Sequence, residues 1–174
     1  MNFNYMSVNI EAGKDREWIE KQYLPNLKGT ILYVGVAEYT HHYESLAKNS
    51  TEFYTLDYEE VSNNCKSSTK HFKMNFLDLP DDQKFDNISL YGLFGIGHSW
   101  TNDLDVIDRI HEKATRHLNK GGTLMLGPRW RSMTWGSETE DIILKMFDKD
   151  FLNDFKLIEL SKLGSNIIYY GRLS

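Results

Sequence analysis

Residues 30–35 read TILYVG and residues 52–57 read EFYTLD, two short apolar runs of which the first ends in glycine and the second in an acid. Runs of this length and composition are typical of buried strands. The same pattern extends along the chain. Further strands are predicted at 71–74, 85–91 and 123–126, with an amphipathic helix at 102–118 and another helix at 138–147. Strands that alternate with helices indicate parallel βαβ units.

The end of the chain departs from this alternation. Strands predicted at 155–160 and 166–172 follow one another directly, with a turn around Gly164. Two strands joined by about five residues form an antiparallel hairpin. The predicted fold is therefore α/β and Rossmann-like: a mostly parallel seven-stranded sheet with helices on both faces and an antiparallel C-terminal strand hairpin.

Size and composition restrict the class of protein. The chain has 174 residues, a net charge of −5 and one cysteine, Cys65. These values predict a single cytoplasmic domain spanning 1–174, without a disulfide and without the basic surface of a nucleic-acid binder. No apolar run approaches the about 18 residues that cross a membrane. The segment 1–27 precedes the predicted sheet, and two roles are open for it: to cover the active site, or simply to pack on the rest of the domain.

A nucleoside site is expected beyond the carboxyl ends of the strands, where open parallel sheets bind ligands. Asp57 lies 22 residues after Gly35, a spacing that suits a carboxylate accepting hydrogen bonds from a ribose diol. The first turn reads GVAEYT, with Ala37 and Thr40 where a dinucleotide site has glycines, and Glu38 would repel phosphates. A cationic nucleoside without phosphates, such as S-adenosylmethionine, fits this turn better than NAD.

Five segments in the appropriate order and spacing resemble the class I S-adenosylmethionine-dependent methyltransferases of the small-molecule or sugar type. They are ILYVGVAEY, FYTLD, FLDLPDDQKFDNISLYGLFGIGH, HLNKGGTLMLG and the final hairpin. Three residues depart from the family pattern: Ala37 and Tyr39 replace glycines of the first turn, and Asn75 replaces an acid after the third strand. The resemblance implies donor binding by Gly35, Val36, Ala37, Glu38, Tyr39, Asp57, Tyr58, Asn75, Phe76 and Tyr91.

Most residues predicted to bind the methyl acceptor lie in the loops that follow the fourth and fifth predicted strands. His98, in GLFGIGHSW, is the candidate general base, because imidazole titrates near neutral pH. Acceptor binding is assigned to Trp100, Arg129, Trp130, His41 and His42. Solvent exposure or core packing would also explain these residues, and His41 and His42 are better explained as the start of the first helix. No set of side chains converges as a metal site would require, so no metal is predicted.

The preferred function is O-methylation of a hydroxyl on a sugar, glycan or other small molecule, with no nucleic-acid or membrane partner. The short chain leaves the acceptor site open, which suits a large acceptor, a second subunit or a longer chain. An alternative is a non-catalytic, methyltransferase-like binding module of a larger chain or complex, suggested by Tyr39. A nicotinamide oxidoreductase is disfavoured by GVAEYT and by the terminal hairpin.

Overall fold

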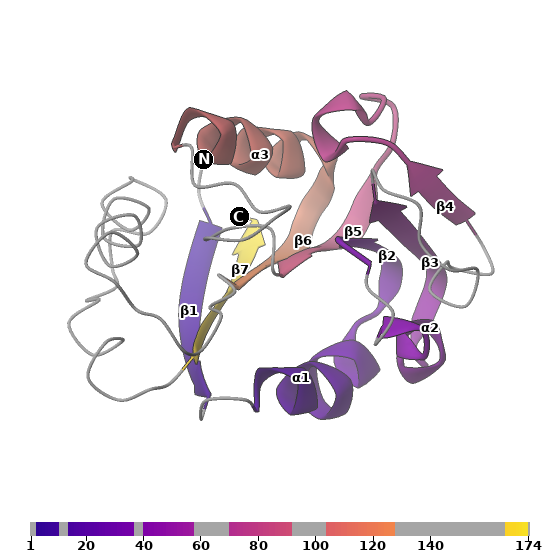
Figure 1. Cartoon of the computed structure of the whole chain (residues 1–174), viewed down its shortest axis with the longest axis vertical. Helices are drawn as coiled ribbons and strands as arrows, with labels where there is room; N and C mark the ends of the chain where they lie inside the picture. Colours follow the sequence, from indigo (N-terminus) through magenta and orange to yellow (C-terminus); the bar gives the residue numbers. More distant parts are fainter. Residues whose placement is uncertain are drawn as a thin grey trace.

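The computed structural model describes residues 3–10, 14–36, 40–57, 70–91, 104–127 and 166–173. Within these residues the chain forms one seven-stranded sheet with helices on both faces (Figure 1). The strands are β1 (Phe3–Ile10), β2 (Gly29–Val34), β3 (Ser50–Asp57), β4 (Lys70–Lys73), β5 (Phe85–Tyr91), β6 (Leu118–Gly127) and β7 (Asn166–Leu173). The helical segments are α1 (Asp15–Trp18), the π-helix η1 (Ile19–Tyr23), the 3₁₀ helices η2 (Leu24–Asn26) and η5 (Phe76–Asp78), α2 (Tyr43–Leu46) and α3 (Leu104–His117).

The strand order across the sheet is β1-β7-β6-β5-β2-β3-β4. Strands β2 to β6 pair in parallel, whereas β7 is antiparallel to both β6 and β1. From β2 the chain moves outward through β3 to β4, and it then returns to the other side of β2 with β5. The strand order therefore reverses between β2 and β5, which is where open α/β sheets bind ligands.

The predicted Rossmann-like, mostly parallel sheet with a reversed C-terminal strand is confirmed, but the predicted set of seven strands is not. No strand was predicted in the N-terminal segment, but β1 lies there and pairs along its whole length with β7. The strand predicted at 155–160 and the helix predicted at 138–147 lie outside the described residues. In addition, β6 begins at Leu118, earlier than the 123–126 run suggested.

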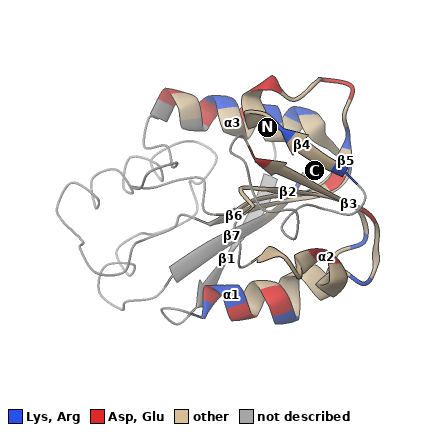
Figure 2. Ribbon diagram, turned by 45° about the vertical axis from the view of Figure 1, so that its right-hand side comes forward, with Lys and Arg blue, Asp and Glu red and all other residues tan. Residues whose placement is uncertain are grey.

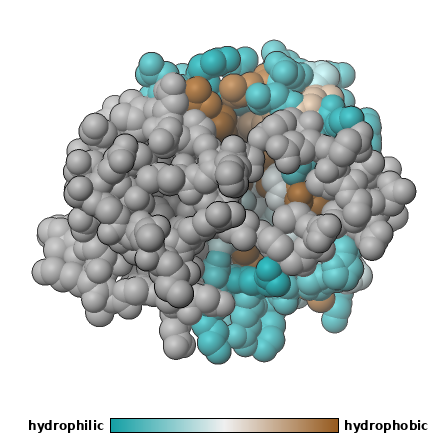
Figure 3. Space-filling view, in the orientation of Figure 1, coloured by the Kyte–Doolittle hydropathy of each residue, from teal (hydrophilic) through white to brown (hydrophobic). Residues whose placement is uncertain are grey.

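Alternating side chains divide the sheet between two hydrophobic cores. Leu32 and Val34 of β2 point into the first core, which α3 and η5 cover, whereas Ile31 and Tyr33 point into the second, which the segment α1 to η2 and α2 cover. Figure 1 shows α3 and α1 on opposite sides of the sheet. Charged residues mark α1 and α3 in Figure 2, and hydrophilic atoms lie at the top and bottom of Figure 3, where these two helices lie. Among the described residues, no helix is long and apolar enough to cross a membrane.

A polar network closes the amino ends of β2, β5 and β6. Asp86 accepts hydrogen bonds from the Thr30 backbone N–H (2.9 Å), the Thr30 hydroxyl (3.1 Å) and the Asn119 amide (2.9 Å). These donors, the Thr30 backbone first, hold the pKa of the Asp86 carboxyl below its ordinary value. The network lies at the end of the strands opposite Gly35 and Asp57, so it supports the fold rather than the ligand site.

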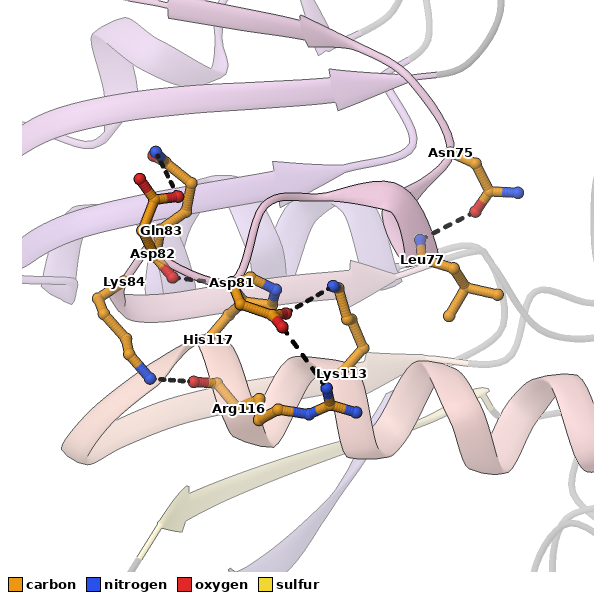
Figure 4. A network of polar contacts seen from close by, with 9 residues as sticks. All are labelled: Asn75, Leu77, Asp81, Asp82, Gln83, Lys84, Lys113, Arg116 and His117. Carbon is orange, nitrogen blue, oxygen red and sulfur yellow. Dashed lines mark hydrogen bonds and ion pairs between the residues drawn. The ribbon is translucent and has the colours of Figure 1, made fainter.

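A second network attaches the loop after η5 to α3 (Figure 4). Lys113 Nζ lies 2.9 Å from Asp81 Oδ1, and Arg116 lies 3.9 Å from the other carboxylate oxygen. The Lys84 ammonium donates to the Arg116 carbonyl, and the His117 Nδ1–H donates to the Gln83 carbonyl at 2.7 Å. These contacts hold α3 against the first core, and the Lys113 ammonium keeps the pKa of Asp81 below its ordinary value.

Candidate functional site

Three predicted donor-binding residues lie at the carboxyl ends of adjacent strands. Gly35 follows β2, Asp57 ends β3 and Tyr91 ends β5, and β2 lies between the other two strands. The Gly35 N–H donates to the Leu56 carbonyl at 2.9 Å, so the turn begins directly beside the end of β3. Gly35 has φ of 81°, a conformation that side chains disfavour. The chain therefore turns away at the reversal point, as a ligand-binding edge requires.

Asp57 is half-buried, and its main chain is fixed between two strands. The Met74 N–H donates to the Asp57 carbonyl at 3.0 Å, and Asp57 is paired in register with Lys73 of β4. A carboxylate held on a strand end has a defined direction, which a residue on a longer loop would lack. Asp57 therefore offers acceptor oxygens at the edge where a ribose diol is expected.

Asn75 and Phe76 have structural roles that the sequence did not predict. The Asn75 side-chain oxygen accepts a hydrogen bond from the Leu77 N–H at 3.0 Å and so caps η5. Phe76 is only 4% exposed and lies in the first core, with its ring 6.3 Å from that of His117. The cap accounts for a short polar residue at position 75, and the Phe76 side chain contributes to the core instead of a surface.

Val36 lies just after β2, and Tyr91 ends β5. Val36 is buried, whereas Tyr91 is half-buried and packs on the second core, as Trp18 of α1 does. Trp18 also stacks on Tyr23, with ring centroids 5.7 Å apart. The N-terminal segment thus contributes aromatic side chains to the same core as Tyr91.

His41 and His42 lie directly before α2. His41 is exposed, and its ring centroid is 5.0 Å from that of His42. His42 Nε2 lies 3.0 Å from Glu20 Oε1, so His42 links the N-terminal segment to the start of α2. Sequence reasoning missed Glu20, because the two residues are far apart in the chain and no local pattern pairs them.

The remaining predicted site residues lie outside the described residues and stay predictions. They are Ala37, Glu38, Tyr39, Tyr58, His98, Trp100, Arg129 and Trp130. In the described part of the chain, no group of three or more histidine, cysteine, aspartate or glutamate side chains could hold a metal ion.

Solved structures similar to this chain include methyltransferases and a pre-rRNA processing protein. The N-methyltransferase NodS from Bradyrhizobium japonicum WM9 superposes with a TM-score of 0.54 at 14% identity, over 83% of this chain and 85% of NodS. NodS in complex with S-adenosyl-L-homocysteine matches with a TM-score of 0.53. The fibrillarin pre-rRNA processing protein of Methanococcus jannaschii has a TM-score of 0.54 at 15% identity, over 96% of this chain and 82% of that protein.

A putative rRNA methylase from Clostridium thermocellum has a TM-score of 0.54 at 12% identity, over 95% of this chain and all of that protein. No protein-family model matches the sequence, and no curated protein matches it either. At these identities the likeness establishes the fold. The chain has the fold of the class I S-adenosylmethionine-dependent methyltransferases.

Proposed function

We propose that this chain binds S-adenosylmethionine at the carboxyl ends of β2, β3 and β5 and transfers its methyl group to a hydroxyl of a sugar, glycan or other small molecule. The observation that carries the proposal is the placement of Asp57 beside the Gly35 turn at the point where strand order reverses. The fold supports it, and one of the similar structures, NodS, holds S-adenosyl-L-homocysteine.

The expected chemistry needs little from the protein beyond binding and alignment. The acceptor oxygen attacks the methyl carbon, and the carbon–sulfur bond electrons leave with sulfur. Asp57 would accept hydrogen bonds from the ribose hydroxyls, and the Gly35 turn would let the backbone approach the donor. Holding the two reactants in line and excluding water supplies most of the acceleration. In this proposal His98 takes the hydroxyl proton as general base.

Donor binding tests the proposal directly. We expect S-adenosyl-L-homocysteine, which the donor becomes after methyl transfer, to bind in calorimetric titration. Asp57→Asn should weaken that binding by about 10- to 100-fold, because hydrogen bonds to a charged group are lost. Asp82→Asn is the matched control: this acid is exposed, lies in the loop after η5, and should leave the affinity unchanged. Equal affinities for the two variants would contradict the role of Asp57.

Turnover separates an enzyme from the alternative function, a non-catalytic binding module. The replacement of glycines by Ala37 and Tyr39 in the first turn favours that alternative. A protein that binds the donor product but methylates no acceptor would support the module. The acceptors assayed should include hydroxyl and amino sugars and a structured RNA, since the similar structures include an N-methyltransferase and a putative rRNA methylase.

If the acceptor is a hydroxyl, His98→Ala should lower turnover by at least about 100-fold and leave donor affinity unchanged, because a general base acts only in the chemical step. His41→Ala tests an exposed histidine that is assigned to acceptor binding and is the next candidate for the base. Unchanged turnover in His98→Ala would mean that another base removes the hydroxyl proton, or that the acceptor needs no base.

A further inference from the structure

Asp57 and Lys73 end two neighbouring parallel strands and are paired in register. Asp57 is the last residue of β3 and Lys73 the last residue of β4. The Met74 N–H donates to the Asp57 carbonyl at 3.0 Å, so the ladder continues through both strand ends. Adjacent strands lie about 4.8 Å apart. The main chains of the two residues are therefore close and fixed relative to one another.

The side chains of Asp57 and Lys73 project from the same face of the sheet. On one face, the rings of Tyr54 and Phe72 stack with centroids 5.9 Å apart and pack with the first core. On the other face, Thr55 Oγ1 and His71 Nδ1 are hydrogen-bonded at 2.8 Å. Successive side chains of a strand alternate between faces, so the pair that follows Thr55 and His71 by two residues shares their face.

We propose that Lys73 is a positioning residue for Asp57, which orients this carboxylate toward the ribose diol of the bound nucleoside. The inference rests on the proposed function and adds a residue to its donor site. A carboxylate has two oxygens and several acceptor directions. One oxygen directed toward the Lys73 ammonium leaves the other for the ribose hydroxyls. Lysine at this strand end thus leaves one defined carboxylate oxygen to accept hydrogen bonds from the ribose hydroxyls.

The free and bound states differ in how strongly the two charges interact. Lys73 is exposed and Asp57 is half-buried, so solvent weakens their attraction in the free protein. A nucleoside that covers Asp57 excludes water and strengthens the attraction. The contribution of Lys73 should therefore appear mainly in ligand affinity, with little change in the stability of the free protein.

The test compares two ligands on two proteins. S-adenosyl-L-homocysteine and its 2′-deoxy analogue, which lacks one ribose hydroxyl, are titrated into the unchanged protein and into Lys73→Met. We expect Lys73→Met to weaken binding of S-adenosyl-L-homocysteine by about threefold to tenfold and to affect the deoxy analogue less, because interacting groups give non-additive effects. Lys73→Arg should restore most of the affinity, since it keeps the charge.

Lys70→Met is the matched control, because Lys70 lies on the same strand but on the other face, with its ammonium 4.8 Å from the centroid of the Phe72 ring. It should leave both affinities unchanged. Equal weakening of both ligands by Lys73→Met, or no weakening, would overturn the inference while leaving donor binding intact. Failure of the unchanged protein to bind S-adenosyl-L-homocysteine would instead overturn the proposed function together with the inference.

Discussion

Gly29→Ala is expected to destabilise the protein by about 3 to 5 kcal/mol. Gly29 has φ of 80°, which disfavours any side chain, and an added Cβ would lie 2.2 Å from Asp86 Oδ2. That oxygen accepts the hydrogen bonds from the Thr30 N–H and hydroxyl. The carboxylate would have to move, and a partly buried charge would lose its two Thr30 donors. Both the backbone strain and the lost hydrogen bonds act on the same strand end.

Urea denaturation of Gly29→Ala and Gly121→Ala separates these two contributions. Gly121 also has a positive φ, 77°, but a Cβ added there would meet no atom within 4 Å. Gly121→Ala should therefore cost only the strain, about 1 kcal/mol. Similar midpoints for the two variants would mean that the Asp86 network adds nothing to the cost at position 29.

The central strands were predictable because a strand buried on both faces reads as a continuous apolar run. The predicted strand at 85–91 coincides with β5 (Phe85–Tyr91), and the run at 30–35 differs by one residue at each end from β2 (Gly29–Val34). Gly35 and Asp57 were predicted at strand ends for the same reason, since a turn residue or an acid interrupts the run. The position of these two residues at the reversal point then follows from the strand order.

Elements defined by distant pairing could not be predicted in this way. The first strand, Phe3–Ile10, mixes apolar residues with asparagine and serine, and its partner is β7 at the other end of the chain. Likewise, Glu20 and His42, or Asp81 and Lys113, meet only after folding. In the sequence, Asn119 next to Lys120 and two glycines indicates a turn, but its side chain donates a hydrogen bond to Asp86 on the neighbouring strand. Local patterns contain no information on such contacts.

Acid is expected to destabilise the protein between pH 6.5 and about 4, because α3 buries two histidines. His111 is 3% exposed, and burial lowers its pKa to about 4, an effect that nearby Asp108 only partly offsets. His117 is fully buried and its pKa is also lowered, mainly by burial. Its Nδ1–H donates to Gln83, and its Nε2 has no hydrogen-bond partner among the described residues. Protonation would place an unsatisfied N–H there.

The direction of the pH effect follows from proton binding by the two states. Below the ordinary histidine pKa of 6.5, the unfolded chain takes up protons that folded His111 and His117 do not, so the free energy of unfolding falls as pH falls. His111 alone should remove about 3 kcal/mol between pH 7 and pH 4. The acids Glu17, Asp81 and Asp86 have lowered pKa values, and their stabilisation is lost only below their ordinary values, 4.5 for Glu17 and 3.8 for the aspartates.

Urea denaturation at a series of pH values measures the fall in the free energy of unfolding. The variant His111→Gln tests whether His111 causes that fall. The variant should be less stable at pH 7, because a packed side chain is changed, but its free energy of unfolding should fall less steeply between pH 6.5 and 4. His41→Gln, at an exposed histidine, should keep the original slope. An unchanged slope in His111→Gln, with His117→Gln equally without effect, would mean that the buried histidines of α3 do not control the acid stability. A reduced slope in either variant shows that the buried histidine replaced there contributes to the acid sensitivity of the fold, because its proton uptake on unfolding has been removed.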